Sequence, residues 1–449
     1  MEMKSPVVIV GAGIAGLTLA HRLLDQGIEV LLLEKESEVG GLARSFAYRG
    51  IVFDIGPHRF HTEDPEVDVY IRGVLGENIL TIERNSKVWF YGRYHAWPLR
   101  VGTMFRLPPG IMLRGALDII RIGAPQMNTF RDFVVSRYGR TLYEHFFRNY
   151  TIKFIGYEPS EIHADWGRVG LDRAVIDKRY QVWSLAKILV SLFSAPKAPM
   201  QFLYPKSGGI AAFCRAQREH IEAAGGTVIT GMTVSHIRRE GNRAIEVTLS
   251  DGQKVPLSHL VWSAPITEAY SMCYGEELDL EYMSSVVYNV VIDHPPLQNF
   301  QWCYFGTDDI LFNRVSIPLH FSPYNAPEKG HGICVELSTK AGNYMWKNPQ
   351  FKIDRIIQHL ITSRLVLDER EILDIFPEKV EYTYPIYKAN YRAELNRGMD
   401  RLQEISNLHL LGRCGAFWYN NMDHSIKMAL EMARQGLDAP SRIEVRSIF

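Results

Sequence analysis

Residues 6–20 read Pro-Val-Val-Ile-Val-Gly-Ala-Gly-Ile-Ala-Gly-Leu-Thr-Leu-Ala. The mostly β-branched run at residues 6–10 is typical of a buried parallel strand, and a helical apolar pattern begins at Ile14. Between them, Gly11 opens a GxGxxG motif. Its first glycine makes the turn, its second lets the backbone approach a pyrophosphate, and its third lets the helix pack closely on the strand. The N-terminus of that helix then faces the anion.

A second strand at residues 29–33 ends at an acidic residue, Glu34. A βαβ fold places a carboxylate at this point to accept a hydrogen bond from a ribose hydroxyl. A glycine motif alone is equally typical of an ordinary turn, but strand, turn, helix, second strand and terminal acid together predict dinucleotide binding. The residues expected to contact the dinucleotide here are Gly11, Gly13, Ile14, Ala15, Gly16, Glu34 and Lys35.

A glycine pair follows the second strand, in Val39-Gly-Gly-Leu-Ala-Arg-Ser45. By itself it could be an exposed turn with a surface arginine. In this position it resembles the glycine doublet of FAD-binding enzymes in the amine oxidase, protoporphyrinogen oxidase and UDP-galactopyranose mutase superfamily. There the glycines let the backbone reach the cofactor, and the arginine can neutralise pyrophosphate. The resemblance implies FAD as the cofactor, with contacts from Gly41, Leu42, Ala43 and Arg44.

Two later segments are expected to return to the cofactor, because FAD is too long for one βαβ unit. The first runs over residues 225–263 and reaches Ala264, with Val234 as the contact nearest the adenosine. A plain antiparallel hairpin gives the same pattern. The second begins with the strand 408–411 and continues through a glycine turn into a helix at 424–435. The positive end of that helix can stabilise a reduced, anionic flavin, which predicts contacts from Gly412, Arg413, Asn421 and Met422.

Charge and composition exclude several other classes of protein. Among 449 residues, 50 Lys and Arg balance 50 Asp and Glu, and no basic tract offers a nucleic-acid-binding stripe. The five cysteines are widely spaced and form no metal-binding pattern, so no metal is expected. No apolar run approaches the roughly 20 residues of a membrane span, and no leader precedes the first strand, which predicts a cytoplasmic location. The oligomeric state stays open.

The chain resembles the UDP-galactopyranose mutases from residue 5 to about residue 435. Residues 56–62, Gly-Pro-His-Arg-Phe-His-Thr, resemble their Gly-x-His-x-Phe-His-Thr loop, which borders the flavin and implies cofactor contacts from Pro57 and His58. Residues 138–153 resemble their helical substrate lobe, and residues 204–209 resemble the return to the cofactor sheet. From the residues alone, His58 is more typical of a satisfied core histidine, and Arg314 of a surface residue or an ion pair.

The resemblance also implies a chemistry and a substrate site. In the mutases, N5 of reduced flavin attacks the anomeric carbon of the sugar, UDP leaves, and the sugar recloses with another ring size. The cofactor supplies this chemistry, which agrees with the absence of a catalytic triad or paired carboxylates from the sequence. His58 and Arg314 are then the expected catalytic residues. The residues expected to bind substrate are Arg59, Tyr150, Trp166, Tyr204, Arg314, Tyr387 and Tyr419.

Two departures from the mutase pattern put UDP-galactose in doubt as the substrate. Residues 198–203 carry no cation where the mutases have a diphosphate-binding arginine, and Lys206 is the nearest substitute. The mutase segment Tyr-x-Tyr-Tyr-Asp-Met reads Phe417-Trp-Tyr-Asn-Asn-Met422 here, so one phenol and one carboxylate are missing. We therefore expect a small-molecule substrate, for which the resemblance implies a sugar nucleotide or related glycan precursor.

These expectations combine into an α/β flavoprotein with a discontinuous Rossmann-type FAD-binding domain at residues 1–100, 203–270 and 400–449. A helical lobe is expected at residues 101–202 and an antiparallel β-sheet lobe at residues 271–399. The first hypothesis for function is a mutase-like, redox-neutral reaction that uses reduced FAD. The alternative is an FAD-dependent oxidoreductase that removes hydride from a small apolar or amine substrate, and a third is a flavin-bound binding module without catalysis.

Overall fold

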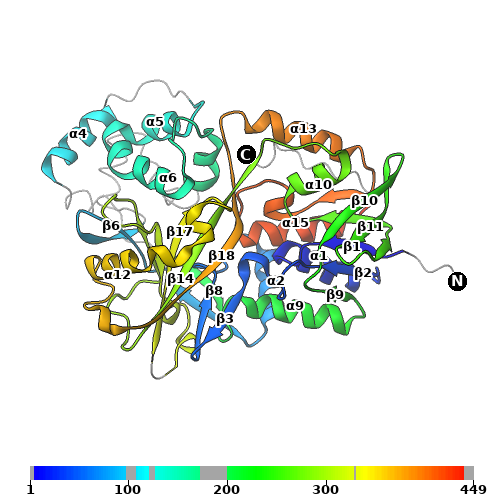
Figure 1. Cartoon of the computed structure of the whole chain (residues 1–449), viewed down its shortest axis with the longest axis horizontal. Helices are drawn as coiled ribbons and strands as arrows, with labels where there is room; N and C mark the ends of the chain where they lie inside the picture. The colour runs from blue at the N-terminus through cyan, green and yellow to red at the C-terminus, as the bar shows by residue number, and fades with distance from the viewer. Residues whose placement is uncertain (1–4, 98–107, 121–126, 172–199, 328–329, 439–449) are drawn as a thin grey trace.

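The computed structural model describes residues 5–97, 108–120, 127–171, 200–327 and 330–438 (Figure 1). Residues 101–107, 121–126 and 172–199 of the expected helical lobe lie outside the described residues, as do residues 1–4, 98–100 and 439–449 of the expected FAD-binding domain. The model shows the α/β architecture expected from the sequence, with a parallel sheet and separate antiparallel sheets. In Figure 1 the helical lobe lies at the upper left, above the large mixed sheet, and the parallel sheet lies at the right.

The parallel sheet has the strand order β19-β13-β1-β2-β9. Its central strand β1 (Val7–Val10) is buried on both faces, as a β-branched run in a parallel sheet should be. Val7 and Ile9 pack with the helices on one face, whereas Val8 and Val10 pack toward the second core on the other face. The remaining strands are β2 (Val30–Leu33), β9 (Thr227–Ile229), β13 (His259–Trp262) and β19 (Leu408–Leu410).

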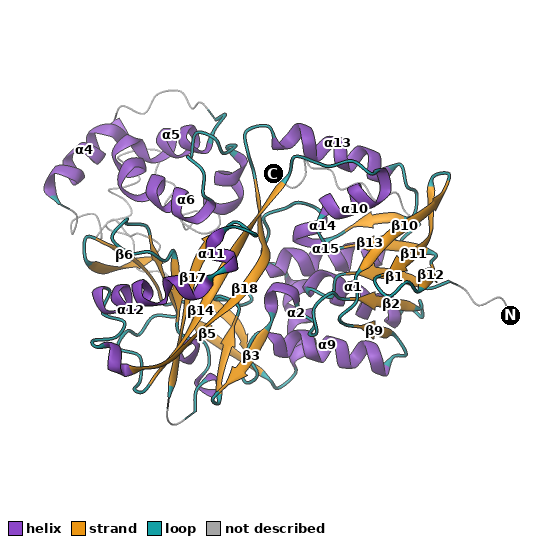
Figure 2. Ribbon diagram, in the orientation of Figure 1, coloured by secondary structure: helices purple, strands orange, loops and turns teal. Residues whose placement is uncertain are grey.

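Helices cover one face of this sheet, and a small antiparallel sheet lies on the other. Helix α1 (Ile14–Asp25) packs between two helices that come from distant parts of the sequence, α9 (Ala211–Ala223) and α15 (Met422–Gln435). Figure 2 shows these helices grouped beside the parallel strands. The small antiparallel sheet consists of β10 (Val234–Glu240), β11 (Arg243–Leu249) and β12 (Lys254–Pro256).

A seven-stranded mixed sheet forms the second large unit, in the order β18-β14-β17-β16-β15-β6-β7. Adjacent strands run antiparallel except β6 and β15, which are parallel. The strands are β6 (Ser86–Phe90), β7 (Arg93–Trp97), β14 (Glu281–Ile292), β15 (Trp302–Phe305), β16 (Arg314–Ser316), β17 (His331–Thr339) and β18 (Ile372–Ile386).

The pairing of β6 differs from the domain limits expected from the sequence. Residues 86–97 fall within the range 1–100 assigned to the FAD-binding domain, yet Ser86–Phe90 and Arg93–Trp97 form one edge of the seven-stranded sheet. The physical reason is a long-range pairing, in which Ser86 aligns with Trp302 and Trp89 with Phe305. Conversely, helix α13 (Tyr391–Gln403) contacts β19 and α10 (Ile266–Tyr274) and so belongs with the parallel sheet.

The described part of the helical lobe contains α4 (Pro109–Ile120), α5 (Phe130–Leu142) and α6 (Arg148–Ile155). Thr129 and Asp132 form a capping box at the start of α5. Lys153 on α6 ties the lobe to the sheet below, because its ammonium donates to the carbonyl oxygens of Phe305, Thr307 and Ile310. Burial lowers the pKa of Lys153 to about 8.

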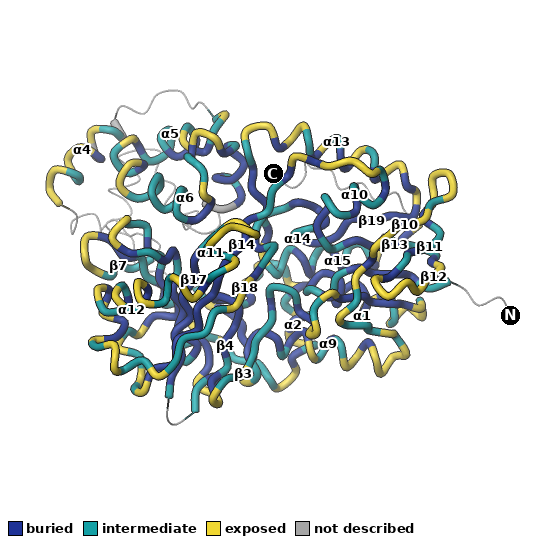
Figure 3. The backbone as a smooth tube through the Cα atoms, viewed as in Figure 1, coloured by how far each residue is buried: buried dark blue, intermediate teal, exposed yellow. Residues whose placement is uncertain are grey.

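Shorter elements complete the chain, and buried backbone concentrates inside the two large sheets, whereas exposed backbone follows the outer helices and turns (Figure 3). No helix within the described ranges is long and apolar enough to cross a membrane. The remaining strands and helices are β3 (Ser45–Tyr48), β4 (Ile51–Asp54), α2 (Pro65–Leu75), β5 (Ile79–Glu83), β8 (Gln201–Pro205), α11 (Tyr344–Lys347), α12 (Ile353–Thr362) and α14 (Gly412–Gly415).

Candidate functional site

A long cavity opens at the carboxyl ends of the parallel strands, where α/β folds bind their ligands. The N-terminal motifs and both predicted returns line it, together with residues between 346 and 382 that the sequence did not indicate. Gly16 and Pro57 are the two predicted cofactor contacts that lie outside its lining. The predicted contacts that do line it are Gly11, Gly13, Ile14, Ala15, Glu34, Lys35, Gly41, Leu42, Ala43, Arg44, His58, Val234, Ala264, Gly412, Arg413, Asn421 and Met422.

The glycines of the first motif hold backbone segments closer together than a side chain would permit. Gly11 has φ +98°, a conformation that favours glycine. A Cβ at Gly16 would lie 2.0 Å from the carbonyl oxygen of Gly11, so this glycine serves helix–strand packing instead of contact with the cavity. A Cβ at Gly41 would lie 3.3 Å from the Cα of Gly13. The second glycine segment therefore closes against the first.

The N-terminus of α1 is prepared to bind an anion. Gly13 caps the helix without a side-chain hydrogen bond, and its first turn carries no acidic residue. Its first N–H groups therefore lack the side-chain oxygen that usually satisfies them. Because Gly13, Ile14 and Ala15 line the cavity, these donors and the helix dipole can act on a phosphate placed there.

Glu34 lines the cavity and also accepts two hydrogen bonds from the backbone of the cavity wall. One carboxylate oxygen accepts from the backbone N–H of Ala12 at 2.8 Å, and the other accepts from the N–H of Glu36 at 3.1 Å. Burial raises the pKa of Glu34, although these two hydrogen bonds act in the opposite direction. Each oxygen has a further lone pair, so the carboxylate can still accept from a ribose hydroxyl.

Arg44 is held at the glycine doublet by two contacts. Its Nε donates to the carbonyl oxygen of Gly41 at 3.0 Å, and its terminal nitrogen lies 3.2 Å from the Glu36 carboxylate. The guanidinium therefore has a fixed position at the cavity wall with a terminal edge left for a phosphate. This arrangement suits the pyrophosphate contact that the sequence predicts.

His58 lies in the cavity as a neutral imidazole. Burial lowers its pKa to about 3, with further lowering from the positive charges of Arg413, Arg314 and Arg59. Its Nδ1 is buried and has no hydrogen-bond partner in the protein. The turn that carries it is closed by a hydrogen bond from the His58 N–H to the carbonyl oxygen of Gly56 at 2.9 Å. His58 therefore offers a ring atom to a bound molecule and does not act as a proton donor at neutral pH.

Arg413 provides the positive charge at this end of the cavity. Its two terminal nitrogens donate to the carbonyl oxygens of Thr383, at 2.7 Å, and Asn420, at 2.6 Å. Its guanidinium also lies over the ring of Tyr384, 4.6 Å from the ring centre. Since both protein partners are neutral carbonyl groups, the positive charge stays available to stabilise negative charge in the cavity.

These features fit FAD. The two glycine segments around Gly11 and Gly41, called here the glycine cradle, suit a pyrophosphate together with the N-terminus of α1. Glu34 suits a ribose. Arg413 and the start of α15 suit the electron-rich end of a flavin. The unpartnered Nδ1 of His58 suits a polar group of the cofactor. A cavity that held only a mononucleotide would leave Arg413 and His58 without a ligand.

The sequence did not indicate several residues on the opposite wall of this cavity. They come from β18, α10 and α11, and Glu381 among them forms an ion pair with Lys35 at 2.9 Å. Burial raises the pKa of Glu268 on α10. No local motif marks these residues, and the pairing of β14 with β18 is what brings those of β18 to the cavity. The wall residues missed in this way are Trp346, Lys379, Val380, Glu381, Tyr382 and Glu268.

A second cavity, called here the aromatic cavity, lies between the helical lobe and the seven-stranded sheet. Four residues expected to bind substrate line it: Tyr150, Trp166, Arg314 and Tyr419. The rings of Trp166 and Tyr419 are 4.8 Å apart. Its other lining residues are Val88, Trp89, Phe90, Trp97, Phe130, His145, Phe146, Phe147, Thr151, Phe154, Tyr304, Gly306 and Thr307.

Arg314 lines the aromatic cavity but is already paired. Its Nε and one terminal nitrogen contact the two carboxylate oxygens of Glu336, at 2.7 and 2.6 Å. Burial lowers the pKa of Arg314, but Glu336 outweighs it and raises the pKa well above its usual value. Arg314 is thus both a member of an ion pair and a residue of the cavity lining. Its charge is largely compensated by Glu336.

Tyr204 and Tyr387 lie in the core, contrary to their expected contact with substrate. Neither lines either of the two cavities described above, and both are fully buried. The hydroxyl of Tyr204 donates to Asp54 at 2.7 Å because β8 turns this side chain into the protein interior. The ring of Tyr387 stacks on Tyr391, with ring centres 4.4 Å apart, and its hydroxyl accepts from the backbone N–H of Tyr419. Tyr387 therefore positions Tyr419.

Arg59 has a different environment from Arg314. Its guanidinium stacks on Trp302 at 4.2 Å, one terminal nitrogen donates to the carbonyl oxygen of Pro57, and its buried Nε has no partner. Among the described residues, no carboxylate forms an ion pair with it. Its charge interacts with Tyr304, Arg314 and Tyr419, which line the aromatic cavity. Burial lowers its pKa.

Comparison with known proteins finds similarity along the whole chain. Residues 9–73 match the model of the NAD(P)-binding Rossmann-like domain. The probable UDP-galactopyranose mutase of Klebsiella pneumoniae is 23% identical over 460 residues, which cover 99% of this chain and 97% of that protein. The dTDP-fucopyranose mutase of Escherichia coli is 21% identical over 445 residues, which cover 95% of this chain and 97% of that protein.

A solved structure agrees with these relatives. The crystal structure of a reduced UDP-galactopyranose mutase superposes with a TM-score of 0.83 at 23% identity, covering 96% of this chain and 95% of that chain. The Rossmann-type fold and the resemblance to the mutases are confirmed, together with the expectation of a flavoenzyme with FAD as its cofactor. The hypothesis of a binding module without catalysis is set aside.

Proposed function

We propose that this chain, a UDP-galactopyranose mutase-like FAD enzyme, rearranges the sugar of a nucleoside diphosphate sugar without net oxidation. The two relatives named above are mutases of UDP- and dTDP-linked sugars. The observation that carries the proposal is the guanidinium of Arg59, which lacks a carboxylate partner among the described residues and has a buried Nε without a partner. Arg59 lies outside the lining of the aromatic cavity but interacts electrostatically with Tyr304, Arg314 and Tyr419, which line it. A buried cation in this state calls for an anionic ligand.

A second arginine strengthens this argument. Arg84 lies 5.5 Å from the centre of the Trp302 ring, and burial lowers its pKa to about 10. It donates to the hydroxyl of Ser86 and contacts the sulfur of Met200, but within the described ranges no carboxylate pairs with it. Arg59 and Arg84 thus present two uncompensated cations around one indole ring. A diphosphate carries the matching charge and accepts bidentate hydrogen bonds from guanidinium groups.

The aromatic cavity suits the rest of such a molecule. Trp166, Tyr304 and Tyr419 offer flat faces for a base or a sugar ring, and burial raises the pKa of Tyr419. Tyr150 is likewise kept protonated by burial, with its pKa raised. Both phenols can therefore donate hydrogen bonds to sugar hydroxyls or phosphate oxygens.

Charges of the kind that a flavin enzyme needs are present in both cavities. His58 and Arg413 line the cofactor cavity, and Arg314 lines the aromatic cavity while acting electrostatically on His58. Bound FAD in its reduced form supplies the electron-rich centre of the reaction. The protein's part is to hold the sugar against that centre, to exclude water with the aromatic walls, and to stabilise negative charge with Arg413.

The test is turnover under controlled flavin redox state. The purified enzyme is reduced with dithionite under anaerobiosis and incubated separately with UDP-galactopyranose, dTDP-fucopyranose and other nucleoside diphosphate hexoses, and products are separated by ion-pair chromatography. The proposal expects an isomer of one of these substrates from the reduced enzyme and none from the oxidised enzyme. Equal turnover by both forms, or no isomer from any substrate, contradicts it.

The aromatic lining favours one second candidate, an oxidoreductase that removes hydride from an apolar or amine substrate. Trp89, Phe146, Phe147 and Phe154 give part of the cavity a wholly apolar wall. An oxidoreductase predicts the opposite behaviour of the oxidised enzyme, which should react with its substrate instead of being inactive. An apolar amine or polyene mixed anaerobically with the oxidised enzyme would bleach the flavin absorption, whereas a mutase substrate leaves the oxidised flavin unchanged.

A further inference from the structure

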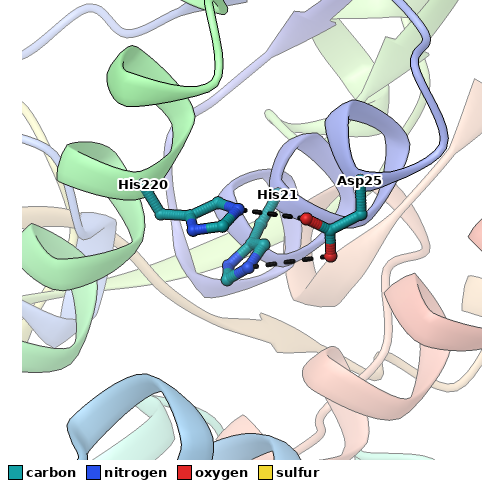
Figure 4. A group of neighbouring side chains, drawn as sticks. All are labelled: His21, Asp25 and His220. Atoms are coloured by element: carbon teal, nitrogen blue, oxygen red, sulfur yellow. Dashed lines mark hydrogen bonds and ion pairs between the residues drawn. The ribbon is translucent and has the colours of Figure 1, made fainter.

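Two histidines and an aspartate converge on the outer surface of the FAD-binding domain, away from both cavities. His21 and Asp25 lie one turn apart on α1, and His220 approaches them from α9 (Figure 4). The Nε2 atom of His220 lies 3.0 Å from one Asp25 oxygen, and the Nε2 atom of His21 lies 3.9 Å from the other. One ligand atom from each residue lies within 4.8 Å of the other two.

A hydrogen-bond chain fixes the proton on His21. The hydroxyl of Tyr70 donates to the side-chain oxygen of Gln217 at 2.7 Å, which leaves the phenol oxygen free to accept from Nδ1 of His21 at 3.2 Å. His21 then carries its proton on Nδ1 and directs the lone pair of Nε2 toward Asp25. This tautomer, held by a second residue, is the arrangement that metal-binding histidines usually show.

The two histidines face the same carboxylate. Their imidazole rings are stacked, with ring centres 3.8 Å apart, and the Nε2 atom of each lies toward an Asp25 oxygen. In the tautomer described above, the lone pair of His21 Nε2 faces the Asp25 carboxylate with no proton between them. A cation placed among the three groups relieves this repulsion.

We propose that His21, Asp25 and His220 bind one zinc ion between α1 and α9. Two imidazoles and a carboxylate are ligands of the type and number that zinc uses when water completes a tetrahedral site. In such a site the ligand atoms lie about 3.3 Å apart. The separations here bracket that value, and the exposed side chains of Asp25 and His220 can adjust to it.

One neighbouring charge competes for the carboxylate. Arg22 donates to Asp25 at 2.8 Å, but its side chain is 45% exposed. An exposed pair of this kind contributes about 1 kcal/mol or less, so zinc displaces it at little cost. The remaining neighbours, Tyr70 and Gln217, are uncharged.

The proposed ion joins two of the helices that cover the cofactor sheet. His21 and Asp25 lie about two and three turns beyond Ile14 at the start of α1, which places the ion roughly 10 to 17 Å from the cofactor cavity along the helix. The site therefore serves stability and takes no part in the reaction. By fixing the far end of α1 to α9, zinc would stabilise the helix whose N-terminus faces the cofactor.

The test measures zinc binding to the holoenzyme after dialysis against a chelator. Isothermal titration with zinc chloride is expected to give one ion per chain. His220→Ala and Asp25→Asn are expected to weaken binding at least about tenfold, and Tyr70→Phe about tenfold through loss of the Nδ1 acceptor. His236→Ala, a change of another exposed histidine, serves as the control and leaves binding unchanged. Zinc is expected to raise the melting temperature of the wild type and not of His220→Ala.

Two results overturn the proposal. One is the absence of saturable zinc binding to the wild type. The other is binding that His220→Ala and Asp25→Asn leave as strong as in the wild type, which would identify an adventitious surface site. Retained flavin absorption and circular dichroism establish that each variant is folded. Because the readouts are metal affinity and melting temperature, the result is independent of the substrate proposed above.

Discussion

Arg314 and Glu336 form a two-pronged buried ion pair, with contacts of 2.7 and 2.6 Å and side chains that are only 14% and 7% exposed. The pair also crowds the loop that carries His58, since a Cβ at Gly56 would lie 3.2 Å from a Glu336 oxygen. Arg314, which the resemblance implies as a substrate-binding residue, is therefore also part of the structure that supports the loop carrying His58. Arg59, in contrast, has no carboxylate partner in the part of the chain that the structure describes, and its buried Nε is unpartnered.

Removing Arg314 alone should destabilise the protein strongly. Arg314→Ala leaves the buried carboxylate of Glu336 without its partner, which is expected to lower the free energy of unfolding by about 3 to 5 kcal/mol. The double change Arg314→Met with Glu336→Leu removes both charges and should recover most of that loss. Urea unfolding of the three proteins measures this. A single variant as stable as the wild type would show that the pair is not buried in solution.

Arg59 should dominate substrate affinity. Arg59→Met keeps the contact with Trp302 but removes the charge, and it is expected to weaken binding of the nucleoside diphosphate sugar roughly ten- to hundredfold. Stability should stay equal or increase, because an uncompensated buried cation is removed. Isothermal titration with UDP and dTDP checks the affinity. Arg370→Ala, a change of an 86% exposed arginine, is the control. Unchanged affinity in Arg59→Met would remove the main support for an anionic substrate.

The glycine cradle should be intolerant of a single methyl group. A Cβ at Gly16 would lie 2.0 Å from the Gly11 carbonyl oxygen, so Gly16→Ala must displace α1 from β1 and is expected to yield protein with little bound FAD. Gly73 provides a matched control, because it lies in helix α2 and a Cβ there meets nothing within 4 Å. Gly73→Ala should retain FAD and gain about 0.5 to 1 kcal/mol of stability. Flavin absorption per polypeptide distinguishes the two variants.

Because of Asp54, the free energy of unfolding should fall as the pH rises from about 4 to 6. Burial raises its folded-state pKa from 3.8 to about 6, even though Ser45, Tyr204 and the Ile210 N–H donate to it. Over this interval the folded state binds the proton that the unfolded state has lost, so raising the pH favours unfolding. The contribution is on the order of 3 kcal/mol. Asp54→Asn should flatten the dependence. An identical slope in wild type and variant, measured by urea unfolding, would contradict this assignment.

The parts of the site that could be predicted are those encoded in short segments. Gly11, Glu34 and Gly41 follow one another along a βαβ unit, so local patterns were enough to place them at the cofactor cavity. The N-terminus of α15 was found the same way, because a glycine turn and Asn421 precede the helix.

The remainder depends on pairings between distant segments. Glu336 could not be assigned as the partner of Arg314 until β16 and β17 were paired, and the wall formed by Lys379 and Tyr382 depends on the pairing of β18 with β14. The position of Tyr204 could not be predicted for a related reason. A strand pattern predicts that side chains alternate between faces, but it does not reveal which face meets the substrate. His21 and His220 likewise meet only because α1 and α9 pack together.

The central claim is that the reaction uses reduced flavin without consuming it. The most direct measurement records the flavin absorption of an anaerobic, dithionite-reduced sample while an active nucleoside diphosphate sugar is converted. We expect many molecules of isomerised sugar per flavin, with the flavin still reduced at the end and the nucleotide recovered attached to the sugar. An oxidised product formed in equal amount to the flavin reduced, starting from the oxidised enzyme, would contradict it and identify the chain as an oxidoreductase.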